Sequence, residues 1–270
     1  MTATDVGRDL QQGLRELCLS AMRGCYEDLA QTAVQEAWSH ERFLLELVEH
    51  ECQVRRRNRI ARLLKESHLP LDKSLEAFEL KRLGVKLRQQ VAALLDGAFL
   101  DRRENVLAFG NPGSGKTHLL CAIGQELIRS GRRVLYTTCA LLVQELLIAK
   151  RDLDLERTLK RLGRYDALII DDLGYVQQDR EEMEVLFTLL AHRYERGSVL
   201  ITSNLPFSQW EAIFKDPMTT AAAIDRLVHH SVILELNLPS YRMEAAKGSA
   251  ASGAQMPKTA GGKDDGSAGG

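Results

Sequence analysis

One glycine-rich stretch limits what this chain can fold into. It has the spacing G-x-x-x-x-G-K-[ST], met by Gly110, Asn111, Pro112, Gly113, Ser114, Gly115, Lys116 and Thr117. The apolar run 106–109 before it predicts a buried strand, and apolar residues at helical spacing follow it as far as Gly131. Glycines adopt positive φ angles easily, so such a turn can bring backbone N–H groups close to an anion at a helix N-terminus. We interpret the stretch as a phosphate-binding loop; the alternative is an ordinary tight strand-to-helix turn.

The last residues of the stretch suit a nucleoside triphosphate. Lys116 offers a mobile positive charge for the β- and γ-phosphates of ATP, and the Thr117 hydroxyl is placed to bind Mg²⁺. His118 follows directly, and we include it with the eight loop residues as a candidate ATP-binding residue. The expected cofactors are therefore ATP and Mg²⁺.

Composition excludes some classes of protein. The chain has 270 residues, of which 44% are apolar and 27% charged, with a formal net charge of −1; these values are typical of a soluble globular protein. No run of 18 apolar residues is present, and the N-terminus lacks the apolar segment of a secretory signal. The five cysteines are scattered, with no C-x-x-C pair, which predicts reduced thiols. We expect a cytoplasmic protein with no membrane partner.

The chain divides into three regions. Residues 1–70 have a helical pattern, and we interpret them as a small partner-binding domain that precedes the main fold. Residues 71–243 alternate strand-like and helix-like segments, which predicts an α/β fold with a mostly parallel sheet. Residues 244–270 are small, polar and glycine-rich, and we expect a disordered tail. The predicted strands are 105–109, 134–138, 167–171, 198–203 and 232–236, and the predicted helices between and after them are 116–130, 140–150, 155–162, 179–195 and 219–230.

Two aspartates follow the apolar run 168–170, which we interpret as a strand buried on both faces. Asp171 falls at the carboxyl end of that strand, where open α/β sheets bind their ligands. A carboxylate there can hold Mg²⁺, so Asp171 joins Thr117 as a candidate metal ligand. Asp172 is a candidate for orienting or deprotonating the attacking water, although an aspartate reaches one methylene less far than a glutamate. A helix cap or a strand-end turn is the alternative for both residues.

Polar residues after the next predicted strand are further candidates. Asn204 ends the run "SVLITSN" and is placed to contact the γ-phosphate or the water, with Thr202 and Ser203 as alternates. A simple turn before Pro206 is the competing interpretation. Arg226 lies in a predicted helix beside Asp225, and spacing alone favours a surface ion pair there.

Basic residues concentrate in the segment "RRRNRIARLLK", residues 55–65. On a helix, Arg55, Arg59 and Arg62 share one face, which suits a phosphate backbone. A solvated helix face or a surface for an acidic partner fits the same pattern equally well. A second basic group at 150–164 is interleaved with acidic residues, which weakens the case for nucleic acid there.

Taken together, the stretches "GNPGSGKTHLLCAIG", "ALIIDDLGY", "SVLITSNLPFSQW" and "IDRLVHHSVILELNLPSYR" resemble the IstB-like ATPases. These are AAA+ helper proteins of bacterial insertion sequences and relatives of the DnaC-like helicase loaders. The likeness spans residues 14–243, with a departure at "AFELKRLG", where family members often have "FDFSF".

This resemblance implies a P-loop AAA+ fold: a three-layer α/β/α core with a five-stranded parallel sheet, a small helical domain before it, and a reduced or absent C-terminal lid. It also implies that Arg226 is an arginine finger acting on a neighbouring subunit, that Asn204 is a sensor residue and that Arg242 lies near a second sensor position. The implied partners are duplex DNA, a cognate transposase and further copies of the chain.

Two other functions share parts of this pattern. A helicase loader would have the same ATPase motifs but bind single-stranded DNA and a helicase; the N-terminal "RFLLELVEHECQVRRRNR" favours the transposition family. A small-molecule or nucleoside kinase would share the phosphate-binding loop, but it gives no role to the "TSN" strand or to the "DRL" helix.

Overall fold

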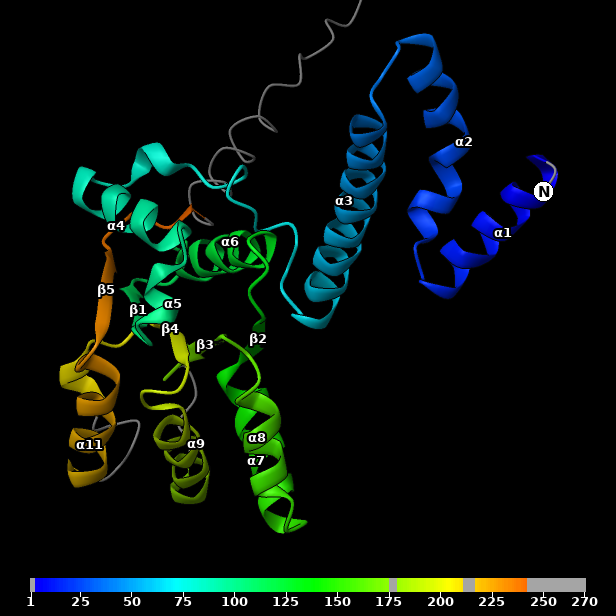
Figure 1. Cartoon of the computed structure of the whole chain (residues 1–270). Helices are drawn as coiled ribbons and strands as arrows, with labels where there is room; N and C mark the ends of the chain where they lie inside the picture. Colours follow the sequence, from blue (N-terminus) through cyan, green and yellow to red (C-terminus); the bar gives the residue numbers. More distant parts are fainter. Residues whose placement is uncertain (1–2, 175–178, 211–216, 242–270) are drawn as a thin grey trace, which may run out of the picture.

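The computed structural model describes residues 3–174, 179–210 and 217–241. At its centre is a parallel five-stranded sheet with the order β2-β3-β4-β1-β5 (Figure 1). The strands are β1 (Asn105–Gly110), β2 (Val134–Thr138), β3 (Ala167–Leu173), β4 (Ser198–Ser203) and β5 (Ser231–Leu236). All five predicted strands are confirmed. Apolar and polar residues do not alternate along these strands, because both faces of the sheet are buried under helices.

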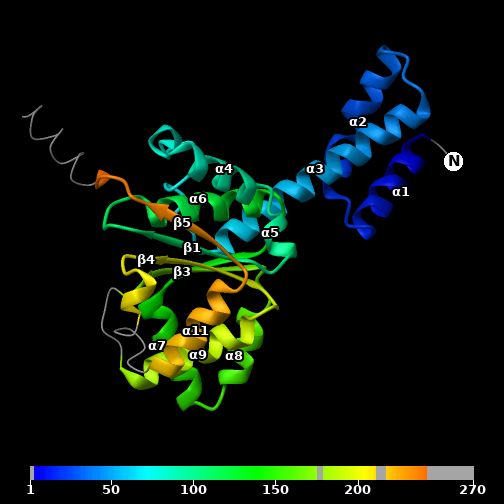
Figure 2. The same cartoon turned by 90° about the vertical axis from the view of Figure 1, so that its left-hand side faces the viewer.

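Helices cover the sheet on both faces, which confirms the predicted three-layer α/β/α fold (Figure 2). One layer contains α4 (Val85–Leu95), α5 (Ala98–Asp101) and α6 (Lys116–Arg129). The other contains α7 (Cys139–Arg151), α8 (Leu155–Leu162), α9 (Arg180–Arg193) and α11 (Pro217–Val228). Short 3₁₀ turns, η1 (Leu80–Arg82) and η2 (Phe207–Gln209), complete the core.

Helices α4 and α5 lie in a part of the chain where the sequence predicted no particular element. They supply Val91, Leu94 and Phe99 to the core, each at most 1% exposed. The Gln90 side chain also donates to the backbone oxygen of Ile233 in β5, over 3.2 Å. The segment before β1 is therefore part of the α/β core and covers one face of its sheet.

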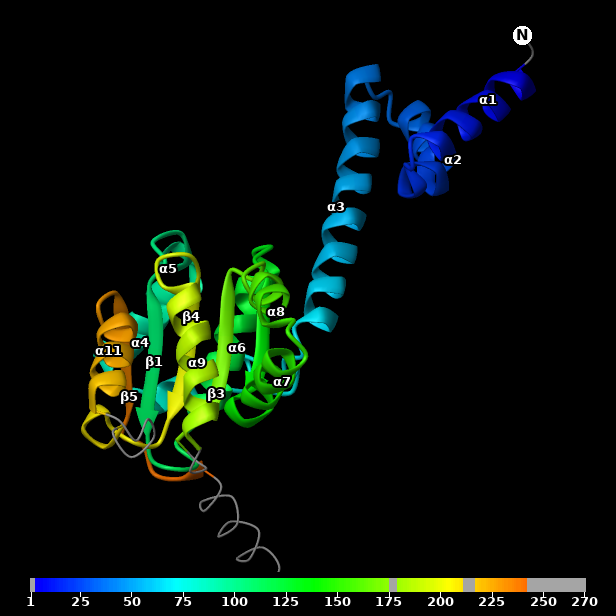
Figure 3. The same ribbon diagram turned by 90° about the horizontal axis from the view of Figure 1, so that it is seen from below.

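Three helices precede the core: α1 (Ala3–Glu16), α2 (Ser20–Gln35) and α3 (His40–Glu66). Figures 1 and 3 show α1 and α2 held away from the sheet, with only the far end of α3 reaching it. Ser39 caps α3 by accepting the backbone N–H of Arg42, as serine commonly does at a helix N-terminus. At the other end of α3, Leu63 is buried in the core cluster that also contains α6.

The arginines of α3 are exposed but largely engaged with the protein. Arg55 donates to Glu51 and to the backbone oxygen of Cys18, Arg59 donates to the backbone oxygen of Gly131, and Arg62 lies 3.9 Å from Glu66. The neighbouring Arg56 and Arg57 are exposed too.

None of the described helices is long and apolar enough to cross a bilayer.

Candidate active site

The glycine-rich loop joins β1 to α6, as predicted. Gly113 and Gly115 adopt φ angles of +81° and +93°, which strain any residue with a Cβ. Gly115 also directly precedes α6, and a Cβ there would lie 3.1 Å from a ring carbon of Phe78. The loop therefore needs glycine for its backbone path, and it leads to the N-terminus of a 14-residue helix.

Two side chains of the loop are buried in it. Lys116 is 7% exposed, and its Nζ donates to the backbone oxygens of Gly110 at 2.7 Å and Asn111 at 3.0 Å. The Oγ of Ser114 is buried and makes no hydrogen bond within the described part of the chain. A cation and an unpaired hydroxyl at the start of a helix fit an anionic phosphate group.

Asp171 is the centre of the site. It is 3% exposed and accepts hydrogen bonds from three hydroxyls on three different elements. Thr117 of α6 donates to Oδ1 at 2.8 Å and Thr202 of β4 donates to the same oxygen at 2.5 Å. Tyr136 of β2 donates to Oδ2 at 2.8 Å. These contacts bring together the two predicted metal ligands, Thr117 and Asp171, and their oxygen donors fit the ligand preference of Mg²⁺.

The phenol of Tyr136 stays a donor in this setting. Burial raises the pKa of Tyr136 above its ordinary value, and the neighbouring negative charge of Asp171 raises that pKa further. Tyr136 was not a candidate in the sequence, because an aromatic residue inside a strand carries no signal of a carboxylate partner. Thr202, an alternate in the sequence, is the residue of "TSN" that contacts Asp171.

Asp172 and Asn204 lie at the same edge of the sheet. Strand β3 ends at Leu173, two residues past its predicted end. The pairing of β3 with β4 is irregular between Ile170 and Leu173. Asp172 sits in this irregularity with φ at +60°, its side chain exposed and its N–H donating to Thr202. Asn204 is exposed directly after β4. Aspartate adopts positive φ more readily than most residues, so the sequence tolerates this irregularity at the carboxyl end of β3.

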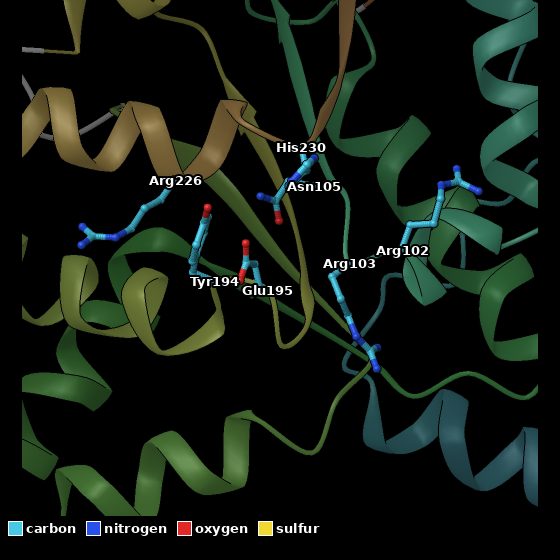
Figure 4. A pocket seen from close by; sticks show the side chains of 7 residues that line it. All are labelled: Arg102, Arg103, Asn105, Tyr194, Glu195, Arg226 and His230. Atoms are coloured by element: carbon cyan, nitrogen blue, oxygen red, sulfur yellow. The ribbon is translucent and has the colours of Figure 1, made fainter.

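Arg226 lies at the other end of the sheet. It borders a cavity of about 250 Å³ at the edge where β1, β4 and β5 begin (Figure 4). Figure 4 shows its side chain extending from α11 toward α9. The guanidinium carbon lies 4.6 Å from the ring centroid of Phe187, and Nη1 is buried with no hydrogen bond from the described residues. The cavity is lined by Arg102, Arg103, Asn105, Tyr194, Glu195, Arg226 and His230.

His118 faces the segment that leads into the core. Its Nε2 is 2.9 Å from the backbone oxygen of Ser74, and its ring packs edge-on against Phe78 with centroids 5.2 Å apart. Its ATP-binding role stays a prediction. Arg242, the expected second sensor, and the predicted 244–270 tail lie outside the described residues.

The sheet is parallel, the glycine-rich loop after β1 opens α6, and the buried Asp171 on β3, which β4 separates from β1, contacts Thr117. Together these features define a P-loop ATPase of the AAA+ class. Comparison with known proteins then identifies the family. Residues 12–249 match the family described as IstB-like ATP binding protein, and the chain belongs to it.

Individual relatives agree with this assignment. The chain is 45% identical, over 234 residues, to an insertion sequence ATP-binding protein of Sinorhizobium fredii, covering 86% of this chain and 78% of the relative. It is 37% identical over 218 residues to the insertion sequence IS21 ATP-binding protein of Pseudomonas aeruginosa, covering 81% and 82% of the two chains.

Solved structures share the fold. The DnaC helicase loader superposes with a TM-score of 0.53 at 15% identity, covering 61% of this chain and 97% of the loader. AMPPCP-bound DnaA from Aquifex aeolicus gives a TM-score of 0.53 at 18% identity, covering 72% and 59%. At these identities the likeness concerns the fold alone.

Proposed function

We propose that this ATPase is a DNA-transposition helper that assembles with further copies of itself on duplex DNA and delivers that DNA to a cognate transposase. Membership of a family whose relatives are named insertion sequence ATP-binding proteins supports the link to transposition. The observation that carries the ATP-dependent part is the buried Asp171 beside Thr117 at the phosphate-binding loop.

In this proposal the loop and the N-terminus of α6 bind the triphosphate, and Lys116 offers its charge to the β- and γ-phosphates. Thr117 and Asp171 hold Mg²⁺, which when bound neutralises charge on the phosphate oxygens. Asp172 orients or deprotonates the attacking water, and Asn204 contacts the water or the γ-phosphate. Both lie at the edge of the sheet where the loop lies.

Arg226 cannot serve its own loop in this arrangement. It borders a cavity at the edge where the strands begin, whereas Thr117 and Asp171 lie where they end. We infer that it completes the ATP site of a neighbouring copy, which makes hydrolysis depend on assembly. Arg226 as a whole is only partly buried beside this cavity, which supports the inference because a group from a neighbouring copy can approach the residue there.

We further propose that residues 1–70 contact the partner protein or DNA while residues 71–243 form the ATPase. The separation of α1 and α2 from the sheet supports this division (Figure 3).

A binding experiment separates this function from that of a helicase loader, which the DnaC-like fold also suits. A labelled duplex and its single strand are titrated with protein, with and without ATP, and followed by fluorescence anisotropy. We expect ATP to strengthen duplex binding, Lys116→Ala to lose that gain, and Lys86→Ala, at an exposed position on α4, to keep it. ATP-dependent preference for the single strand would favour the loader instead, and binding to neither strand would remove DNA as a direct partner.

A further inference from the structure

Tyr136 occupies an unusual position beside the proposed magnesium site. Of the described residues, it alone donates to Oδ2 of Asp171, at 2.8 Å, while Thr117 and Thr202 both donate to Oδ1. The two oxygens of one carboxylate are therefore held from opposite sides. The donor to Oδ2 comes from β2, which is an edge strand of the sheet.

The backbone of Tyr136 is held in turn by the end of α3. Its N–H donates to the backbone oxygen of Ser67 at 2.8 Å, so the residue after α3 pairs with the open side of β2. Ser67 is fully buried, and its Oγ donates to the backbone oxygen of Leu64 and accepts the N–H of Leu69. The last turn of α3 thus fixes the strand from which the Tyr136 side chain reaches Asp171.

We propose that Tyr136 is a positioning residue for the magnesium site, which fixes the plane of the Asp171 carboxylate so that Oδ1 stays turned toward Thr117. The proposal rests on the function proposed for Asp171 above. The terminal torsion of an aspartate has only a broad two-fold preference, so hydrogen bonds decide its orientation. Partners of metal-binding carboxylates commonly change metal affinity or activity 10- to 100-fold when they are removed.

The proposal also connects the N-terminal helices to ATP hydrolysis. A chain of two hydrogen bonds and one side chain, from Ser67 through Tyr136 to Asp171, joins the end of α3 to the carboxylate. A partner that shifts α3 relative to β2 would change the position of Tyr136, and with it the affinity of the Asp171 site for magnesium.

The test is Tyr136→Phe, which removes the hydroxyl and keeps the ring. Tyr165→Phe is the matched control, because Tyr165 also packs against the core but precedes the start of β3, at the opposite edge of the sheet. Binding of a fluorescent, non-hydrolysable ATP analogue is measured in EDTA and then across a Mg²⁺ titration, and ATPase activity is measured over the same titration.

For Tyr136→Phe we expect affinity in EDTA to stay within about twofold of the parent and the half-saturating Mg²⁺ concentration to rise about tenfold. Excess Mg²⁺ should restore ATPase activity, which a folding defect would not allow. Tyr165→Phe should titrate like the parent. An unchanged Mg²⁺ titration, or a defect that excess Mg²⁺ leaves in place, would overturn the positioning role.

Asp171→Asn separates this inference from the proposed function. If Asp171→Asn loses the response to Mg²⁺ while Tyr136→Phe titrates normally, the site stands and only the role of Tyr136 falls. If Asp171→Asn keeps the full response, the proposed magnesium site falls together with the inference.

Discussion

Replacing Glu51 with glutamine should release α2 from α3 and leave the ATPase core intact. The Glu51 side chain is buried on α3 and accepts the backbone N–H groups of Ala21 and Met22, at 2.8 and 3.0 Å, at the start of α2. It also accepts Nε of Arg55 at 2.8 Å. No residue of α2 is fully buried, and its partly buried side chains bury limited area, so these bonds should contribute measurably to its attachment.

The magnitude follows from the bonds that are lost. The Arg55 side chain is 56% exposed, so its pairing with Glu51 contributes little. Hydrogen bonds to a charged acceptor contribute about 1.5–3 kcal/mol each. Both N–H groups donate to the same oxygen, Oε2, so a glutamine oxygen in its place keeps both as neutral bonds of about 1 kcal/mol each. We therefore expect the opening free energy of α2 to fall by about 2 kcal/mol, which corresponds to roughly 30-fold faster exchange.

Amide hydrogen exchange followed by mass spectrometry measures this directly. Amides of α2 should exchange roughly 30-fold faster in Glu51→Gln, while amides of α6 and β1 keep their rates. Glu49→Gln is the matched control, because Glu49 is an exposed glutamate of the same helix. Exchange in α2 that stays within threefold of the parent would refute the reasoning.

Three further predictions concern pH, the loop and DNA. Burial acts to raise the pKa of Glu51, but the bonds from Arg55 and the two backbone N–H groups outweigh it and lower that pKa. The stability that the ionised carboxylate gives to α2 is therefore present above the ordinary glutamate pKa of about 4.3 and should fade as pH drops below it. Hydrogen exchange of the α2 amides, corrected for the intrinsic rate, should rise over that range of pH. Gly115→Ala should weaken nucleotide binding at least tenfold in a fluorescence titration, because φ is +93° and Phe78 crowds the new Cβ, whereas Gly24→Ala, with nothing within 4 Å, should not. If α3 binds DNA, replacing Arg56 and Arg57 by alanine should reduce the slope of log affinity against log salt by about 2, and an unchanged slope would place the DNA elsewhere.

The sheet was predictable from the sequence because each strand is an apolar run between polar or glycine-rich breaks. The loop was predictable because glycine, lysine and threonine are demanded by backbone geometry and charge at fixed spacing. The irregularity at Asp172 was not, since it depends on the register between β3 and β4 rather than on local sequence.

The hydrogen-bond partners of Asp171 could not be predicted from local sequence either. Tyr136, Thr117 and Thr202 converge on it from three elements, and only the order of strands in the sheet brings them together. The placement of Arg226 is likewise a consequence of topology. Helix α11 ends just before β5 begins, so Arg226, near the end of α11, lies at the end of the sheet opposite to the phosphate-binding loop.

The most direct test of the account mixes two inactive variants. Arg226→Ala keeps its own Asp171, and Asp171→Asn keeps its own Arg226, so each alone should hydrolyse ATP at least 1,000-fold more slowly than the parent, on the order expected for losing an arginine finger. Combined in equal amounts under assembling conditions, random neighbours should recreate intact sites and restore about a quarter of the parent ATPase rate. A mixture no more active than the two variants measured separately would contradict an ATP site shared between neighbouring copies.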